Sequence, residues 1–133
     1  MKRISLKSQQ GQAVTEFALV LPILAFLLFA VIQFGIVFNN WVQLTDATRA
    51  GARKGAVSRR LQDPKAACED AVRASATNLK PSNGLTANCS TAPGVWQPGD
   101  ELTVTATYPY SISLLGLISK SGTLSSTTKE RVE

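Results

Sequence analysis

The most prominent pattern in the sequence is an apolar run near the amino terminus. Residues 17–38 carry no charge, and sixteen of these 22 residues are Leu, Ile, Val or Phe. As a helix this run would be about 33 Å long, which matches the hydrocarbon core of a bilayer. The run is longer than the apolar core of a secretory signal, and no small-x-small cleavage motif follows it. The pattern therefore predicts one retained transmembrane helix.

The helical pattern continues beyond the apolar run. Between Asn39 and Arg60, apolar and polar residues alternate at roughly helical spacing, and no proline interrupts them. We predict a single helix from Ala13 to Arg59, with Pro22 either near its first turns or at a kink. The amphipathic half carries small residues that indicate a closely packed face, namely Ala50, Gly51, Gly55 and Ala56.

Shorter elements are expected in the remaining residues. Asp63 suits a helix N-cap and Pro64 a first helical residue, so a second helix is predicted from there to Leu79. Residues 81–100 are dense in Pro, Gly, Asn and Ser, which is typical of a loop with turns. Trp96 is expected to be a buried anchor within that loop.

The carboxyl-terminal residues carry a strand pattern. Residues 101–108 alternate strictly between apolar and polar side chains, which predicts a half-buried strand that Pro109 ends. Residues 123–132 are a second strand candidate, and residues 95–97 are a third. The predicted fold class is therefore α+β, with a long amino-terminal helix, a second short helix and a small antiparallel sheet packed on the amphipathic half of the long helix.

The net charge of +5 resides in two clusters that flank the apolar run. Basic residues beside a membrane span contact lipid headgroups. Beyond Arg60, six basic and seven acidic residues nearly cancel. No aromatic residue interleaves with the second cluster, which argues against nucleic-acid binding. The two clusters are Lys2, Arg3 and Lys7 before the run, and Arg49, Arg53, Lys54, Arg59 and Arg60 after it.

Two cysteines, Cys68 and Cys89, bear on the topology. The positive charges on the two flanks are nearly balanced, so charge alone does not orient the span. An even cysteine count in a small domain after a membrane segment indicates an oxidising, exported compartment. We predict that the two cysteines form a disulfide, the alternative being two separate buried thiols. The amino terminus is then expected in the cytoplasm and the carboxyl-terminal domain outside.

The composition argues against an enzyme, a metal site and a cofactor site. The chain contains no histidine, its two cysteines lack the CxxC spacing of zinc ligands, and it has no glycine-rich phosphate loop. Two pairs of adjacent carboxylates, Glu69-Asp70 and Asp100-Glu101, lie beside predicted element starts, where acids suit a helix terminus or a solvated turn. No catalytic residue is therefore assigned.

The stretch GQAVTEF, Gly11 to Phe17, resembles the class III signal of type IV pilins. The resemblance implies that a prepilin peptidase cuts between Gly11 and Gln12, so that Glu16 becomes the fifth residue of the mature chain. It further implies that Glu16 neutralises the new amino group of Gln12, its own or a neighbour's, as subunits dock by their apolar helices beginning at Phe17. Read without the resemblance, Glu16 marks the first turn of a transmembrane helix, where the helix dipole favours an acid.

Among proteins with this signal, the chain resembles the TadE-like pseudopilins of tight-adherence (Tad, Flp-type) pilus systems over most of its length. The resemblance is carried by the Gly-x4-Glu-Phe start, Leu21-Pro22, Gln33-Phe34-Gly35 and the segment from Asp46 to Arg53, together with TVTATYPYSISLLG and the final ERVE, and it is weaker between Leu61 and Asp100. One departure is Gln33, where the family commonly has Glu; read from the residues alone, this amide hydrogen-bonds a neighbouring helix. The resemblance implies a pilin-like fold and a minor pilin whose partners are the prepilin peptidase, other pilin subunits and the Tad assembly platform.

These inferences divide the chain into three parts: a cleaved leader (1–11), a transmembrane part of the long helix (12–41) and an extracytoplasmic pilin-like head (42–133). The expected location is the cytoplasmic membrane, with incorporation into an extracellular adhesive pilus implied by the resemblance. Two alternatives stay open at this point. The first is a membrane-anchored assembly factor that is never polymerised, and the second is a secreted or anchored binding domain unrelated to pili.

Overall fold

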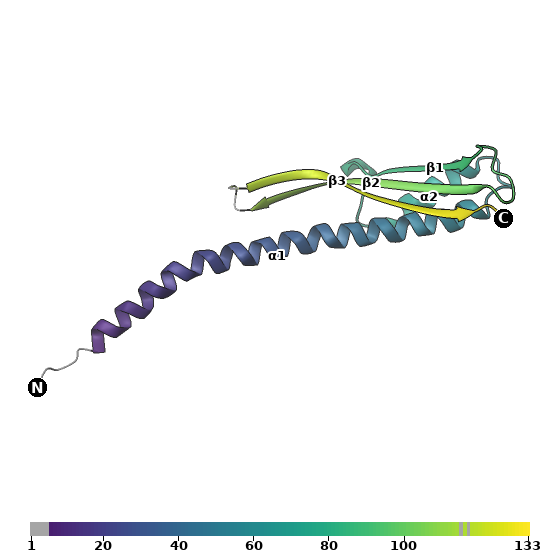
Figure 1. Ribbon diagram of the computed structural model, residues 1–133. Helices are drawn as coiled ribbons and strands as arrows, with labels where there is room; N and C mark the ends of the chain where they lie inside the picture. Colours follow the sequence, from purple (N-terminus) through teal and green to yellow (C-terminus); the bar gives the residue numbers. More distant parts are fainter. Residues whose placement is uncertain (1–5, 115, 117) are drawn as a thin grey trace, which may run out of the picture.

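A 51-residue helix, α1 (Leu6–Ala56), dominates the computed structural model, which describes residues 6–114, 116 and 118–133. α1 joins the apolar run to the amphipathic half without a break, as predicted, and it curves in its amino-terminal part (Figure 1). The helix continues through Pro22, which removes one backbone hydrogen bond. It begins before the predicted Ala13 and ends at Ala56 rather than at Arg59. The early end follows from a tight turn in which the amide of Ser58 bonds to the carbonyl of Gly55 at 3.2 Å.

The second helix, α2 (Pro64–Ser75), starts as predicted. The side chain of Asp63 accepts a hydrogen bond from the amide of Ala66 at 2.9 Å, which satisfies one free donor of the first turn. α2 ends at Ser75, so the prediction that it reaches Leu79 was wrong. Leu79 is nevertheless buried, at 1% exposure, because the segment after the helix turns it into the core. Leu79 is therefore buried, as the helical pattern predicted, although the backbone there is not helical.

Three strands form one antiparallel sheet in the order β1–β2–β3. β2 (Glu101–Leu114) pairs with β3 (Ile118–Arg131) over their full lengths, whereas β1 (Thr86–Ala92) pairs only with residues 101–107 of β2. A short 3-10 helix, η1 (Pro81–Asn83), precedes β1.

Two of the strand predictions are corrected by this sheet. The third strand is β1, in a segment predicted as loop, and residues 95–97 are not a strand. β2 also runs through Pro109, which was predicted to end it. Since β1 stops opposite Thr107, Pro109 lies where β2 has no partner on that side, and a proline is tolerated on an open strand edge.

The core lies between the carboxyl-terminal half of α1, α2 and one face of the sheet (Figure 1). Leu44 and Ala47 of α1, Val72 of α2, and Leu102 and Val104 of β2 are all fully buried. The alternation predicted for residues 101–108 is thus confirmed, because its even-numbered face is the buried one. The observed α+β architecture matches the predicted fold class.

Thr48 is a buried polar side chain in this core. Its hydroxyl donates to the carbonyl of Thr45 at 2.8 Å and lies 3.2 Å from the hydroxyl of Ser126 and 3.1 Å from that of Thr128. A buried hydroxyl costs free energy unless it is hydrogen-bonded, and here three partners are within reach. The contacts link α1 to β3 and help to fix how the sheet lies on the helix.

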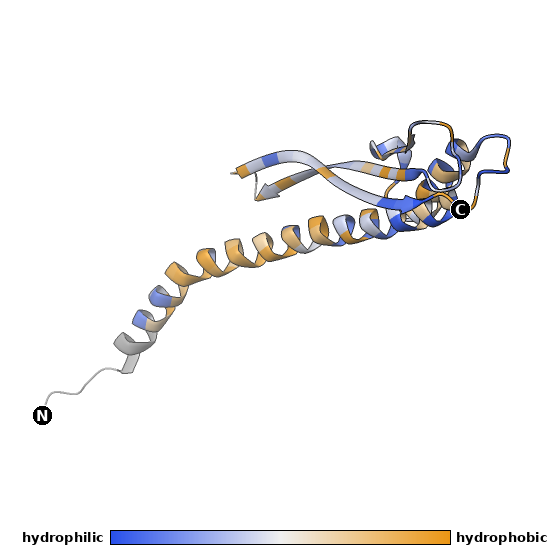
Figure 2. Ribbon diagram, turned by 45° about the vertical axis from the view of Figure 1, so that its right-hand side comes forward, coloured by the Kyte–Doolittle hydropathy of each residue, from blue (hydrophilic) through white to orange (hydrophobic). Residues whose placement is uncertain are grey.

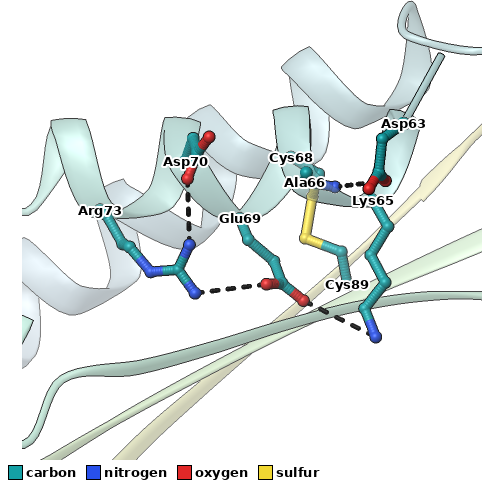
Figure 3. Close-up of polar contacts among 8 residues, drawn as sticks. All are labelled: Asp63, Lys65, Ala66, Cys68, Glu69, Asp70, Arg73 and Cys89. Carbon is teal, nitrogen blue, oxygen red and sulfur yellow. Dashed lines mark hydrogen bonds and ion pairs between the residues drawn. A yellow bond between two sulfur atoms is a disulfide. The ribbon is translucent and has the colours of Figure 1, made fainter. Parts of the chain in front are cut away.

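The predicted pairing of Cys68 with Cys89 is present as a disulfide that joins α2 to β1 (Figure 3). Both residues are buried, and the Cα atoms are 6.3 Å apart. β1 is an edge strand with mostly polar side chains, so it buries little apolar area of its own. The disulfide therefore anchors β1 to α2 covalently, whereas the packing of β1 alone contributes little.

Replacing Cys68 and Cys89 together by alanine is expected to destabilise the head by about 3 kcal/mol, because the open chain regains the entropy of a loop of roughly 22 residues. Denaturant unfolding of the full chain in detergent, followed by circular dichroism, measures the change. Wild-type protein treated with a reductant should shift toward the variant. Identical unfolding midpoints with and without the disulfide would contradict the expectation.

Candidate assembly site on the long helix

The amino-terminal turns of α1 bring Gln12 and Glu16 together. The side-chain amide of Gln12 donates to a carboxylate oxygen of Glu16 at 3.2 Å, one helical turn away. The hydroxyl of Thr15 donates to the carbonyl of Gly11 at 2.9 Å. All of these residues are exposed, and no part of the head reaches them. Glu16 therefore lies on the same helix face as Gln12, within reach of groups at that position.

The apolar half of α1 is uncovered. Within residues 11–56 the helix is long and apolar enough to cross a membrane, and none of its most apolar stretch is buried in the chain. Phe17 is 62% exposed, and Figure 2 shows the apolar colouring continuing along the helix to the start of the head. An exposed apolar rod of this length requires lipid or other helices around it. The described structure thus has one amino-terminal helix suited to a single-pass membrane anchor.

The glycines of α1 fall into two classes. A Cβ added at Gly51 would collide with Val72 and approach the carbonyl of Cys68 at 3.2 Å, and one at Gly55 would lie 2.6 Å from a methyl group of Leu102. The small-residue face predicted from the sequence is therefore the face that α2 and the sheet cover. At Gly11 and Gly35, in contrast, nothing lies within 4 Å of an added Cβ. Glycine costs roughly 1 kcal/mol in a helix interior relative to alanine, so these two need a reason outside the folded chain.

Gln33 has a partner that the sequence did not indicate. Its side-chain amide donates to the carbonyl of Ser113 in β2 at 3.3 Å. Read from the residues alone, Gln33 was expected to hydrogen-bond a neighbouring helix, whereas within this chain its partner is a strand. The two residues are 80 positions apart, so no local pattern could have paired them.

Three of the four adjacent carboxylates lie in surface ion pairs, and the fourth, Asp100, accepts a hydrogen bond from the amide of Gln97 at 2.8 Å. Glu69 is 3.8 Å from Lys65 and 3.3 Å from Arg73, and Asp70 is 3.0 Å from Arg73, all along α2 (Figure 3). Glu101 pairs with Lys129 across the sheet at 2.7 Å. Exposed pairs of this kind contribute at most about 1 kcal/mol each. Among the described residues there is no group of three or more His, Cys, Asp or Glu side chains suited to a metal ion.

The family comparison is decisive for the amino-terminal segment. A family model described as TadE-like protein matches residues 11–53. The chain carries a TadE-like segment. The match confirms the predicted resemblance over these residues, and it associates the chain with Tad pilus systems and with a membrane location.

The TadE-like segment begins at Gly11 and ends within the last turns of α1. It therefore includes the Gln12–Glu16 pair, the apolar rod and the close-packed Gly51. The head from α2 onward, including the TVTATYPYSISLLG stretch, lies outside the matched residues. No characterised protein and no solved structure matches the chain.

Proposed function

We propose that this protein is a structural minor pilin or pseudopilin of a Tad-type pilus, cut by a prepilin peptidase between Gly11 and Gln12. The observation that carries the proposal is the position of Gly11. It is the first residue of the TadE-like segment, and it lies in an exposed helical turn where no packing requires a glycine. A glycine without a structural reason, followed at the fifth position by Glu16, fits recognition by a peptidase.

Cleavage would give Glu16 a cationic partner. A free amino group at Gln12 would lie one helical turn from the carboxylate, since the Gln12 side chain already reaches that carboxylate. A carboxylate at the edge of a bilayer costs a few kcal/mol unless it is paired or reaches the headgroups. A neighbouring subunit's amino group could serve equally well once the apolar rods pack together. The pair favours assembly because either charge alone is expensive in a low-dielectric setting.

The proposed topology follows from the same division of the chain. Residues 1–11 are the leader, residues 12–41 contain the membrane span, and residues 42–133 are the head outside the cytoplasmic membrane. The buried Cys68–Cys89 disulfide supports an oxidising compartment for the head. The proposed partners are the prepilin peptidase, the assembly platform and other pilin subunits, with adhesion as the activity of the assembled fibre.

The proposal is tested by the intact mass and amino-terminal residue of the protein isolated from its native cells. We expect a mature chain beginning at Gln12 and a Gly11→Leu variant that stays at full length. The variant is a fair control because the space around Gly11 is open and the substitution leaves the helix intact. An uncut wild-type chain in piliated cells would overturn the proposal, and a start beyond Phe38 would indicate a conventional secretion signal.

A further inference from the structure

The β2–β3 hairpin extends well past the rest of the head. β1 covers β2 only as far as Thr107, yet β2 and β3 remain paired up to Leu114 opposite Ile118. In Figure 1 this part of the hairpin projects over α1 toward the amino terminus, beyond α2 and β1. The head therefore has an arm that points along the helix toward the predicted membrane.

The arm reaches the apolar run itself. The hydrogen bond from Gln33 to the carbonyl of Ser113 places the end of β2 beside Gln33. Gln33 lies eight residues before Trp41, which corresponds to about 12 Å along a helix. The hairpin end is thus level with residues that the sequence assigns to the membrane span.

The side chains at the end of the arm are apolar, and a lysine and a tyrosine lie further from the end. Leu114 is half-buried, and Ile118, directly opposite, is 52% exposed. Lys120 is exposed and pairs across the hairpin with Ile112, while Tyr110 lies one alternation further back on β2. An apolar end followed by a tyrosine and a lysine is the order found where a protein enters a membrane interface, because both residues place their polar ends at headgroup level.

We propose that the end of the β2–β3 hairpin is a second membrane contact, which rests in the lipid interface on the side of the membrane where the head lies. The apolar run of α1 ends at Phe38, five residues or about 8 Å along the helix beyond Gln33. With residues 17–38 in the hydrocarbon, the end of the hairpin lies at the head-side end of the span, within about 8 Å of its boundary, which is the depth that an interfacial element reaches.

The open strand edges limit how deep the hairpin goes. β3 is an edge strand along its whole length, and β2 has no β1 partner after Thr107. Unpaired backbone groups do not enter the hydrocarbon, whereas an interfacial element is buried by only about 5–10 Å. The hairpin is therefore a surface contact that holds the head against the bilayer, and it does not cross it.

The contact is tested with single cysteines that carry an environment-sensitive nitrobenzoxadiazole dye in the full chain. Because the only two cysteines are joined in the disulfide, an introduced cysteine is the only free thiol. We compare Ile118→Cys with Ser125→Cys, an exposed position further back on β3, and with Val31→Cys in the span, which is 70% exposed in the chain. The protein is reconstituted into vesicles of phosphatidylcholine and phosphatidylglycerol, with and without lipids spin-labelled near the headgroup.

The expected result is a blue-shifted emission at position 118 that spin-labelled lipid quenches, while position 125 shows neither effect. Position 31 should also be shielded, which confirms that the anchor has inserted. A dye at position 118 that behaves like the one at 125, with position 31 shielded, overturns the hairpin proposal and leaves the anchor and the proposed pilus function untouched. Shielding at 118 that lipid does not quench, and that fades as the protein is diluted in lipid, assigns the surface to a second copy and equally overturns it.

Discussion

Replacing Gly51 by valine is expected to destabilise the head strongly and to leave α1 helical. The added side chain would occupy the space of a Val72 methyl group and press on the Cys68 carbonyl, at the point where α2 crosses α1. Overpacking a well-filled core costs typically 1–3 kcal/mol and more when the backbone blocks relaxation, so we expect about 3 kcal/mol or more. That is a large share of the stability of a domain of this size.

Gly35→Val is the matched control. It makes the same substitution in the same helix, at a position where nothing lies within 4 Å of an added Cβ. Thermal unfolding by circular dichroism and limited proteolysis, both on the full chain in detergent, compare the two variants. Equal melting temperatures for both variants would mean that α2 does not pack on α1 at Gly51.

Replacing Glu16 by glutamine is expected to remove the protein from sheared pili. Glutamine keeps the size and hydrogen-bonding ability of the side chain but cannot neutralise the amino group that the proposed cleavage creates at Gln12. Loss of a charge interaction of about 1.4 kcal/mol lowers incorporation tenfold, and a partly desolvated pair should lose more than this. Immunoblots of the sheared and membrane fractions from native cells give the ratio directly.

Asp46→Asn is the control for the lost charge. Asp46 is an exposed carboxylate on the same helix, 3.5 Å from Arg49 and outside the predicted span, so its neutralisation should leave the pilus fraction unchanged. Unchanged incorporation of the Glu16 variant, with normal processing, would identify the protein as an anchored assembly factor that does not polymerise. A drop in both variants would point to a general charge requirement and not to the amino-terminal pair.

Most of the fold could be predicted from the sequence because its strongest elements have strong periodicities. The apolar run and the spacing that follows it defined α1, Asp63 and Pro64 marked the start of α2, and strict alternation marked the first half of β2. β1 was missed because an edge strand with polar side chains looks like a loop, and only Cys89 of that strand is buried. Pro109 was wrongly predicted to end β2 for a related reason. Its position on an open strand edge depends on where β1 stops, which the sequence did not show.

At the candidate site, too, the positions of residues close in sequence could be predicted, whereas contacts between distant residues could not. Gly11, Gln12, Glu16 and Phe17 are close in sequence, so their spacing on one helix was readable from the chain alone, while their roles stay predictions. Trp96 was expected to be a buried anchor and is only partly buried, with its ring nitrogen donating to the carbonyl of Gly55 at 2.9 Å. The partner of Gln33 depended on the full length of the β2–β3 hairpin, which no local pattern specified.

The last two residues fasten the sheet to the end of α1. Val132 is buried, and the amide of Glu133 donates to the carbonyl of Ala56 at 3.0 Å, which satisfies a free acceptor of the last helical turn. Residue 133 therefore lies beside the carboxyl-terminal end of α1, at the end of the molecule opposite to the start of that helix (Figure 1). A tag or reporter fused after Glu133 would extend away from the bilayer, whereas trimming the chain by two residues would uncap the long helix.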